Sequence, residues 1–159
     1  MDYQDFVLMD CPLKKAMNVY MNRVALNVFS YFDAGKKPSG AEPERFYHGF
    51  VLGLLVELQN RYIITSNRES GFGRYDVVLE PKNFEEDNGI LKKAGGDAII
   101  MEFKVHDSED EETLEDTVQA ALGQIEEKQY AVQLVERRIP AERIRCYGFA
   151  FEGKMVLIG

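Results

Sequence analysis

The spacing of apolar residues along the chain predicts helices on both sides of a run of strands. Residues 14–32 and 42–60 carry apolar side chains at helical spacing, and the second segment is apolar nearly all round between Phe46 and Leu58. The clearest helix is predicted over 113–137, which a single apolar stripe follows. Because a helix that is apolar on every side is usually buried between layers, we expect the segment 42–60 to lie inside the domain.

Between and after these helices the pattern changes to short runs of β-branched and aromatic residues, which are typical of strands. Glu152 and Gly153 form a two-residue turn that joins the last two runs as a hairpin. The segment 81–96 is expected to be a hairpin connection enlarged by insertion. The expected strands are 62–66, 75–80, 97–105, 144–151 and 154–158.

This order of elements predicts an α/β or α+β chain, with a sheet covered by helices, and argues against a doubly wound nucleotide-binding fold. The loop signal at 36–40, Lys-Lys-Pro-Ser-Gly, marks a soft boundary. We therefore expect residues 1–40 to be a helical lead-in and residues 41–159 to be the domain proper. In a longer protein, the lead-in would join this domain to another one.

The composition narrows the possible functions. The 159 residues and 18.2 kDa suit one domain, and the formal net charge is −8, from 27 acidic and 19 basic residues. Proteins that hold nucleic acid by bulk positive charge neutralise phosphates with Lys and Arg, so the charge argues against that class. It does not exclude an enzyme whose acidic groups hold a divalent metal. Two cysteines and two histidines exclude a disulfide scaffold and argue against a four-ligand zinc site.

The sequence also bears on location. No segment reaches the roughly 18–20 uninterrupted apolar residues that a membrane span needs. The first residues, Met-Asp-Tyr-Gln-Asp, are acidic and lack the basic region of a signal peptide. We expect a cytoplasmic protein with no membrane partner.

The strand 97–105 carries the strongest chemical signal. Glu102 and Lys104 share one face of this otherwise apolar strand, since alternate residues of a strand point to the same side. If the preceding strand pairs with it antiparallel, Asp76 comes close to Glu102, and two carboxylates and an amine converge at one sheet edge. Two carboxylates can hold Mg²⁺, which can activate a water for attack on a phosphate, with the amine as an orienting or basic group. The alternative is a strand end with a solvated polar face.

The segment 107–116 holds seven acidic residues in ten. We expect a solvated loop that leads into a helix N-terminus, where acidic side chains favour the helix dipole. The alternative is a metal or partner site.

Asp76 followed by Glu102-Phe103-Lys104 resembles the motif of the PD-(D/E)XK nuclease superfamily, which has the restriction-endonuclease-like fold. Longer strings, which cover about 14–159, resemble the nuclease-like domain at the C-terminus of bacterial proteins that begin with an AAA-type ATPase domain. The resemblance implies that this chain is part of a longer protein with such an ATPase domain. The matching strings are 46–50, 66–76, 100–104, 121–125 through Tyr130, and 147–154.

The resemblance assigns Asp76 and Glu102 as ligands of Mg²⁺ or Mn²⁺, and Lys104 as the catalytic lysine. The chain also resembles the RecB-like branch of these nucleases. In that branch a helix before the strands supplies a His or Glu, and the helix after them supplies a Gln and a Tyr. The Gln is expected to be Gln124, as a catalytic residue. For Tyr130, six residues later, we expect a packing role.

The remaining candidates have structural alternatives. His48 and Glu57 lie on opposite sides of the predicted helix, and we favour His48 as the metal ligand over Glu57. A buried core histidine is the alternative for His48. Arg68 and Arg74 flank a Gly-containing turn and are expected to contact substrate phosphate, unless they form an internal network with Glu69.

Two function classes follow from these residues. The first is a Mg²⁺-dependent nuclease that hydrolyses phosphodiester bonds of nucleic acid, with DNA favoured. The second is a catalytically silent nuclease-like module that binds or regulates an attached AAA-type ATPase. The apolar face of residues 14–32 would favour a homodimer.

Overall fold

The computed structural model describes residues 49, 51–53, 55–69, 74–87, 89–94, 96–153 and 155–159. The predicted lead-in 1–40, the helix 14–32 and His48 lie outside the described residues. Of the predicted helix 42–60, the structure describes helical residues from 49 onward, ending in the short 3-10 helix η2 (Val56–Asn60).

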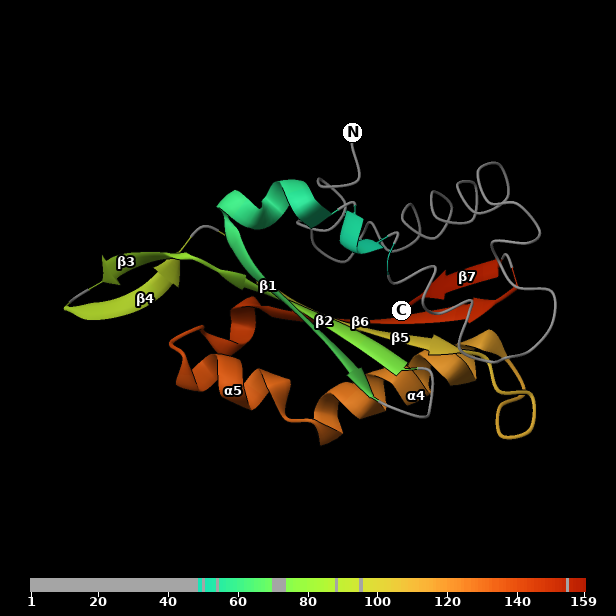
Figure 1. The fold of residues 1–159 in the computed structure, drawn as a ribbon. Coiled ribbons are helices and arrows are strands. Elements are labelled where there is room, and N and C mark those ends of the chain that lie inside the picture. Colours follow the sequence, from blue (N-terminus) through green and yellow to red (C-terminus); the bar gives the residue numbers. More distant parts are fainter. Residues whose placement is uncertain are drawn as a thin grey trace.

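A mixed sheet of five strands forms the centre of the fold (Figure 1). The strand order is β1-β2-β5-β6-β7, and every neighbouring pair is antiparallel except the parallel pair β5 and β6. This arrangement confirms the predicted α+β class. The strands are β1 (Tyr62–Glu69), β2 (Arg74–Pro81), β5 (Ala98–Val105), β6 (Ile144–Glu152) and β7 (Met155–Ile158).

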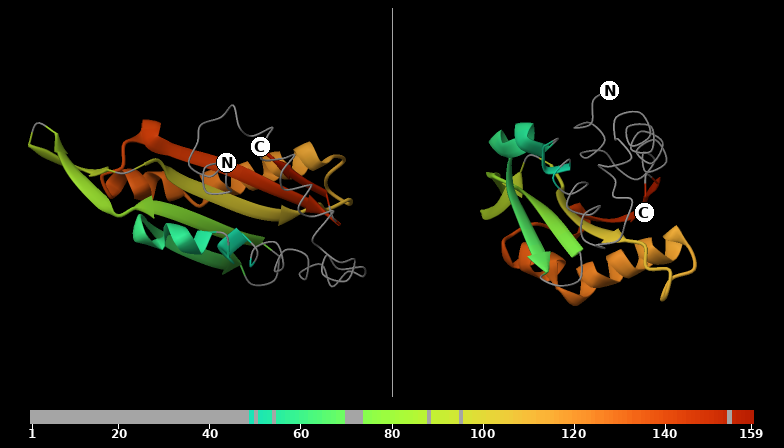
Figure 2. Two further views of the ribbon diagram at one scale, coloured as in Figure 1. Left: turned by 90° about the horizontal axis from the view of Figure 1, so that it is seen from above. Right: turned by 45° about the vertical axis from the view of Figure 1, so that its right-hand side comes forward.

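Helices cover both faces of this sheet. α4 (Leu114–Glu127) and α5 (Tyr130–Glu136) lie along one face and form the crossover between the parallel strands β5 and β6 (Figures 1 and 2). A short 3-10 helix, η3 (Ala141–Arg143), leads into β6. The opposite face is covered by η2 and the helical residues before it.

The prediction of one continuous helix over 113–137 is wrong, because the structure divides it into α4 and α5. Gln129, between the two helices, has a left-handed backbone with φ 56°. The apolar stripe of the predicted helix does not continue across the break. Val132, which would follow Ile125 on the same face, is 52% exposed, whereas Leu134, about 180° from Ile125 on a continuous helix, is buried against the sheet. The sequence pattern therefore predicts the buried face of α4 correctly and that of α5 wrongly.

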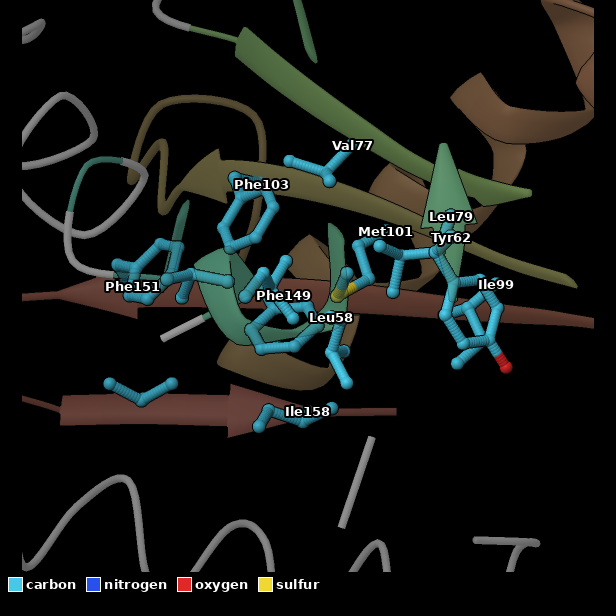
Figure 3. Close-up of a cluster of buried hydrophobic side chains, with 13 residues drawn as sticks. Leu58, Tyr62, Val77, Leu79, Ile99, Met101, Phe103, Phe149, Phe151 and Ile158 are labelled. Atoms are coloured by element: carbon cyan, nitrogen blue, oxygen red, sulfur yellow. The ribbon is translucent and has the colours of Figure 1, made fainter. Parts of the chain in front are cut away.

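Two apolar layers hold the sheet between the helices. Side chains on one face of β2 and β5, such as Val77, Leu79 and Met101, belong to the larger cluster, in which Phe103 and Phe149 stack with centroids 4.7 Å apart (Figure 3). Alternate residues point to the other face, and there Val78, Ala98 and Ile100 pack under α4 and α5 with Ile125, Leu134 and Ile139. Successive residues of β2 and β5 thus point alternately to the two faces of the sheet.

The close approach of α4 to β6 depends on one glycine. A Cβ added at Gly148 would lie 2.8 Å from the backbone oxygen of Val118 and 3.2 Å from the Ala121 side chain. A larger residue at Gly148 would push α4 away from the sheet.

The expected hairpin within 81–96 is present. β3 (Asn83–Asp87) and β4 (Ile90–Ala94) pair antiparallel as a separate two-stranded sheet, which extends beyond one end of the main sheet (Figures 1 and 2).

The segment before β1 is buried on one side only. Val51, Leu55 and Leu58 are buried, whereas Val56 is 53% exposed. The expectation of a helix buried all round does not hold at Val56. No helix in the described ranges is long and apolar enough to cross a membrane.

Candidate functional site

Two carboxylates face each other at the centre of the sheet. Asp76 of β2 is the register partner of Glu102 of β5, which confirms the antiparallel pairing expected from the sequence. Both side chains point toward α4 and α5, because Asp76 lies two residues from Val78 on β2 and Glu102 lies two residues from Ile100 on β5, and alternate residues of a strand share a face. They lie on inner strands rather than at the sheet edge, and they are 1% and 0% exposed. Two buried carboxylates side by side require a compensating positive charge.

Lys128, in the turn after α4, supplies that charge. Its Nζ atom lies 3.0 Å from Oδ2 of Asp76 and 3.3 Å from each carboxylate oxygen of Glu102. The same Nζ lies 5.9 Å from the centroid of the Tyr130 ring. Lys128 follows Ile125 by three residues and precedes Val132 by four, so it interrupts the apolar stripe of the predicted helix. A charged residue on that face is the sequence signal that could have identified it.

The break between α4 and α5 also brings Tyr130 to the carboxylates. Its hydroxyl donates a hydrogen bond of 2.7 Å to Oδ2 of Asp76. Burial, followed by the hydrogen bond to Asp76 and the charge of Asp76, raises the pKa of Tyr130 from 10.0 to about 12. Tyr130 also packs against the smaller apolar cluster, as expected from the sequence. Its polar contact was not expected, because that expectation assumed one straight helix from Gln124, which ends before Gln129.

Asp76 receives a third hydrogen bond from β1. Asn67 Nδ2 donates to Oδ1 of Asp76 at 3.0 Å. Donors from β1, from the turn and from α5 therefore converge on one carboxylate and fix its orientation.

Lys104 lies two residues beyond Glu102 on β5 and makes an ion pair with Glu111. Both side chains are largely buried, with 11% and 6% exposure. Glu111 belongs to the acidic segment 107–116, which otherwise matches the expected solvated loop before the N-cap Thr113 of α4. Next to this pair, His106 Nδ1 lies 2.8 Å from Thr117 Oγ1 and 3.7 Å from Glu111 Oε2. The ion pair between Lys104 and Glu111 thus joins β5 to the loop before α4.

The remaining candidates contribute less to the described geometry. Gln124 lies in the last turns of α4, and its Nε2 donates to Glu127 Oε2 at 3.2 Å. Arg68 and Arg74 lie on β1 and β2, with Arg74 in register with Lys104. The side chains of Arg68 and Arg74, and those of Glu57 and Glu69, lie outside the described part of the structure.

The donor chemistry of the carboxylate pair fits a divalent cation that prefers oxygen ligands. Asp76 and Glu102 are close enough to share one ammonium group, as Lys128 demonstrates. Mg²⁺ is commonly held by one or two carboxylates and keeps several waters. Within the described ranges, no group of three or more His, Cys, Asp or Glu side chains could hold a metal, so the described residues would supply two ligands of an ion at this pair.

Comparison with known proteins agrees with this geometry. Neither the curated proteins nor the solved structures give a match. A family model described as PD-(D/E)XK nuclease superfamily matches residues 42–159, which is well over half of the chain. Proteins of this superfamily generally use divalent metal ions. The mixed five-stranded sheet with helices on both faces is the restriction-endonuclease-like arrangement expected for such a chain. On the strength of the family match, this chain belongs to the PD-(D/E)XK nuclease superfamily.

Proposed function

We propose that the chain is a metal-dependent nuclease domain that hydrolyses phosphodiester bonds of nucleic acid, with DNA the favoured substrate. The observation that carries the proposal is the pair formed by Asp76 and Glu102, which are register partners, buried, and joined by one cation. A fold gains little stability from two buried carboxylates side by side, so a role in chemistry explains their position better than a role in packing.

In this proposal Asp76 and Glu102 hold Mg²⁺ or Mn²⁺, with His48 as a further ligand. The bound ion would lower the pKa of a water and stabilise negative charge on the phosphate. Lys104 orients the attacking water or accepts its proton, and Gln124 assists at the same face of the sheet. Arg68 and Arg74, near the ends of β1 and β2, hold substrate phosphate.

The finer assignments rest on the resemblance of the longer strings. We propose that the domain belongs to the RecB-like branch and to a cytoplasmic bacterial protein in which an AAA-type ATPase domain comes first. Because the chain carries a net charge of −8, the ATPase domain would deliver the nucleic acid. A homodimer through residues 14–32 is part of the same proposal.

One observation favours the alternative, a catalytically silent module that binds or regulates the ATPase. Lys104 is ion-paired with Glu111, and Lys128 lies on the carboxylate pair, so both cations already have acidic partners. A silent domain would keep these pairs as structural contacts.

The deciding experiment is a calorimetric titration of Mg²⁺ and Mn²⁺ into the wild type and an Asp76→Asn/Glu102→Gln variant. Glu80→Gln is the matched control, because Glu80 is also buried and is paired with Arg137 at 2.9 Å, away from the carboxylate pair. Cleavage of single- and double-stranded DNA and RNA is measured on the same proteins.

We expect saturable metal binding and cleavage in the wild type and in Glu80→Gln, and neither in the double variant. Equal metal binding in all three proteins, without cleavage of any substrate, would reject the nuclease and support the silent module.

A further inference from the structure

Lys128 makes contacts that a solvated lysine does not make. Its side chain is only 15% exposed, and its Nζ atom lies within 3.3 Å of three carboxylate oxygens on two strands. These partners are 52 and 26 residues away in the sequence, so the contact depends on the tertiary fold. Charge-assisted hydrogen bonds of this kind are strong, and removing one partner leaves buried charge without compensation.

The backbone position of Lys128 suits a side chain that changes partners. Lys128 is the C-cap of α4, where the negative end of the helix dipole favours a cation. It precedes Gln129, whose left-handed backbone turns the chain into α5. A lysine here has a long flexible stem and can leave the carboxylates without disturbing a helix interior.

We propose that Lys128 is a functional residue of the carboxylate site, with one role before the metal binds and another after it. In the metal-free protein its ammonium neutralises Asp76 and Glu102. When a divalent ion takes these carboxylates, the ammonium is displaced and contacts a non-bridging oxygen of the substrate phosphodiester. The second role rests on the proposed function. Neither role requires a proton transfer or a covalent step.

The location of Lys128 keeps its charge near the carboxylate site after displacement. A displaced ammonium would remain close to the carboxylates that hold the ion, since its stem begins in the turn beside Asp76 and Tyr130. Positive charge at that point stabilises the charge that develops on the phosphate in the transition state.

The first test uses metal-free protein in the presence of a chelator. Lys128→Met keeps the apolar stem and removes the charge, and its Tm is compared with that of the wild type. The same change is then made in the Asp76→Asn/Glu102→Gln background. We expect Lys128→Met to lower Tm by about 5 °C or more in the first background and to have little effect in the second. An equal effect in both backgrounds, or none in either, would overturn the counter-ion role.

The second test measures Mn²⁺ binding and cleavage. Without the competing ammonium, Lys128→Met should bind Mn²⁺ about tenfold more tightly than the wild type. At saturating Mn²⁺ its kcat should nevertheless fall about a hundredfold, and Lys128→Arg should recover part of this loss. Lys82→Met is the matched control for both measurements, because Lys82 donates to the backbone oxygen of Gln59 outside the site.

The outcomes separate this inference from the proposed function. If the wild type binds Mn²⁺ and cleaves while Lys128→Met matches it in both, the inference fails and the proposed function stands. If the wild type neither binds Mn²⁺ nor cleaves, the proposed function fails and so does the substrate role of Lys128. The comparison of Tm values in the two backgrounds then still decides whether Lys128 is the counter-ion of Asp76 and Glu102.

Discussion

Asp76 is held by donors from three parts of the chain: Asn67 in β1, Lys128 after α4 and Tyr130 at the start of α5. Asn67 bonds one carboxylate oxygen and the other two donors bond the second, so the side chain has little freedom to rotate. A ligand held in this way is preorganised, and a metal that binds it meets a fixed oxygen. The individual contribution of each donor can be measured by removing it.

Removing the Tyr130 hydroxyl should weaken the fold in a pH-dependent way. We expect Tyr130→Phe to lose about 1.5–3 kcal/mol of unfolding free energy at neutral pH, as is typical for a hydrogen bond to a charged group. The pKa of Tyr130 is raised to about 12 in the fold from 10.0. Its contribution is therefore fully present below pH 10 and is lost as the pH rises through about 12.

Urea unfolding of both proteins over this alkaline range measures the difference in stability, and the absorbance of tyrosinate follows the titration directly. Burial also raises the pKa of Tyr62, which both proteins keep, so the absorbance step near pH 12 should be smaller in Tyr130→Phe by the contribution of one tyrosine. A step of undiminished size in the variant would assign the raised pKa to another tyrosine.

Lys104 combines a proposed catalytic role with a structural one. Lys104→Ala should abolish cleavage, and it also leaves the largely buried Glu111 without its ion-pair partner. We expect a loss of about 3–5 kcal/mol in unfolding free energy, the usual result of breaking a buried pair from one side.

Adding Glu111→Gln to Lys104→Ala removes the unpaired charge and should recover most of that stability, while cleavage stays absent. Chemical denaturation and a cleavage assay on the single and double variants separate the two effects. Recovery of cleavage together with stability would show that Lys104 acts only on the fold.

At the scale of the elements, the break between α4 and α5 decides the composition of the site. Gln129 takes a left-handed conformation in which a β-branched side chain is strained and glycine is not. Gln129→Val should lower the unfolding free energy by about 1–2 kcal/mol. Gln129→Gly should raise it by about 0.5 kcal/mol, because relief of the left-handed conformation outweighs the entropy of glycine.

Gln133→Val provides the comparison, since Gln133 is an exposed residue inside α5 and a β-branched residue there should cost only a few tenths of a kcal/mol. Thermal unfolding of the three variants tests the ranking. Equal losses in Gln129→Val and Gln133→Val would mean that the break does not depend on the left-handed residue.

The same break marks the limit of prediction from the sequence. Strand alternation and antiparallel pairing were enough to bring Asp76 opposite Glu102, because those rules are local and periodic. The turn at Lys128 and Gln129 carries neither Gly nor Pro, so the usual signals of a helix end are absent there. The change of buried face, from the side of Ile125 to that of Leu134, follows from the left-handed backbone at Gln129 and not from the spacing of apolar residues. The sequence does not predict the ion pair of Lys104 with Glu111 for a related reason. A run of acidic residues predicts a solvent-exposed segment and does not show which acidic side chain is buried.

At the scale of the whole molecule, the central sheet and the β3–β4 hairpin are separate structures. β2 and β5 are neighbours in the central sheet, with Leu79 opposite Ile99, so the chain between them needs only a short connection. β3 and β4 pair with each other in their own sheet and extend past the end of the central one (Figure 2).

Replacing residues 83–94 with a Gly-rich linker of about three residues should therefore leave the domain folded. Because Leu79 and Ile99 stay paired beside the new connection, we expect Tm to stay within about 4 °C of the wild type. Binding of Mn²⁺ should also be unchanged, since Asp76 and Glu102 keep their strand pairing. A large loss of Tm would show that the hairpin stabilises the end of the central sheet, and unchanged Tm with reduced cleavage would assign the hairpin to substrate contact.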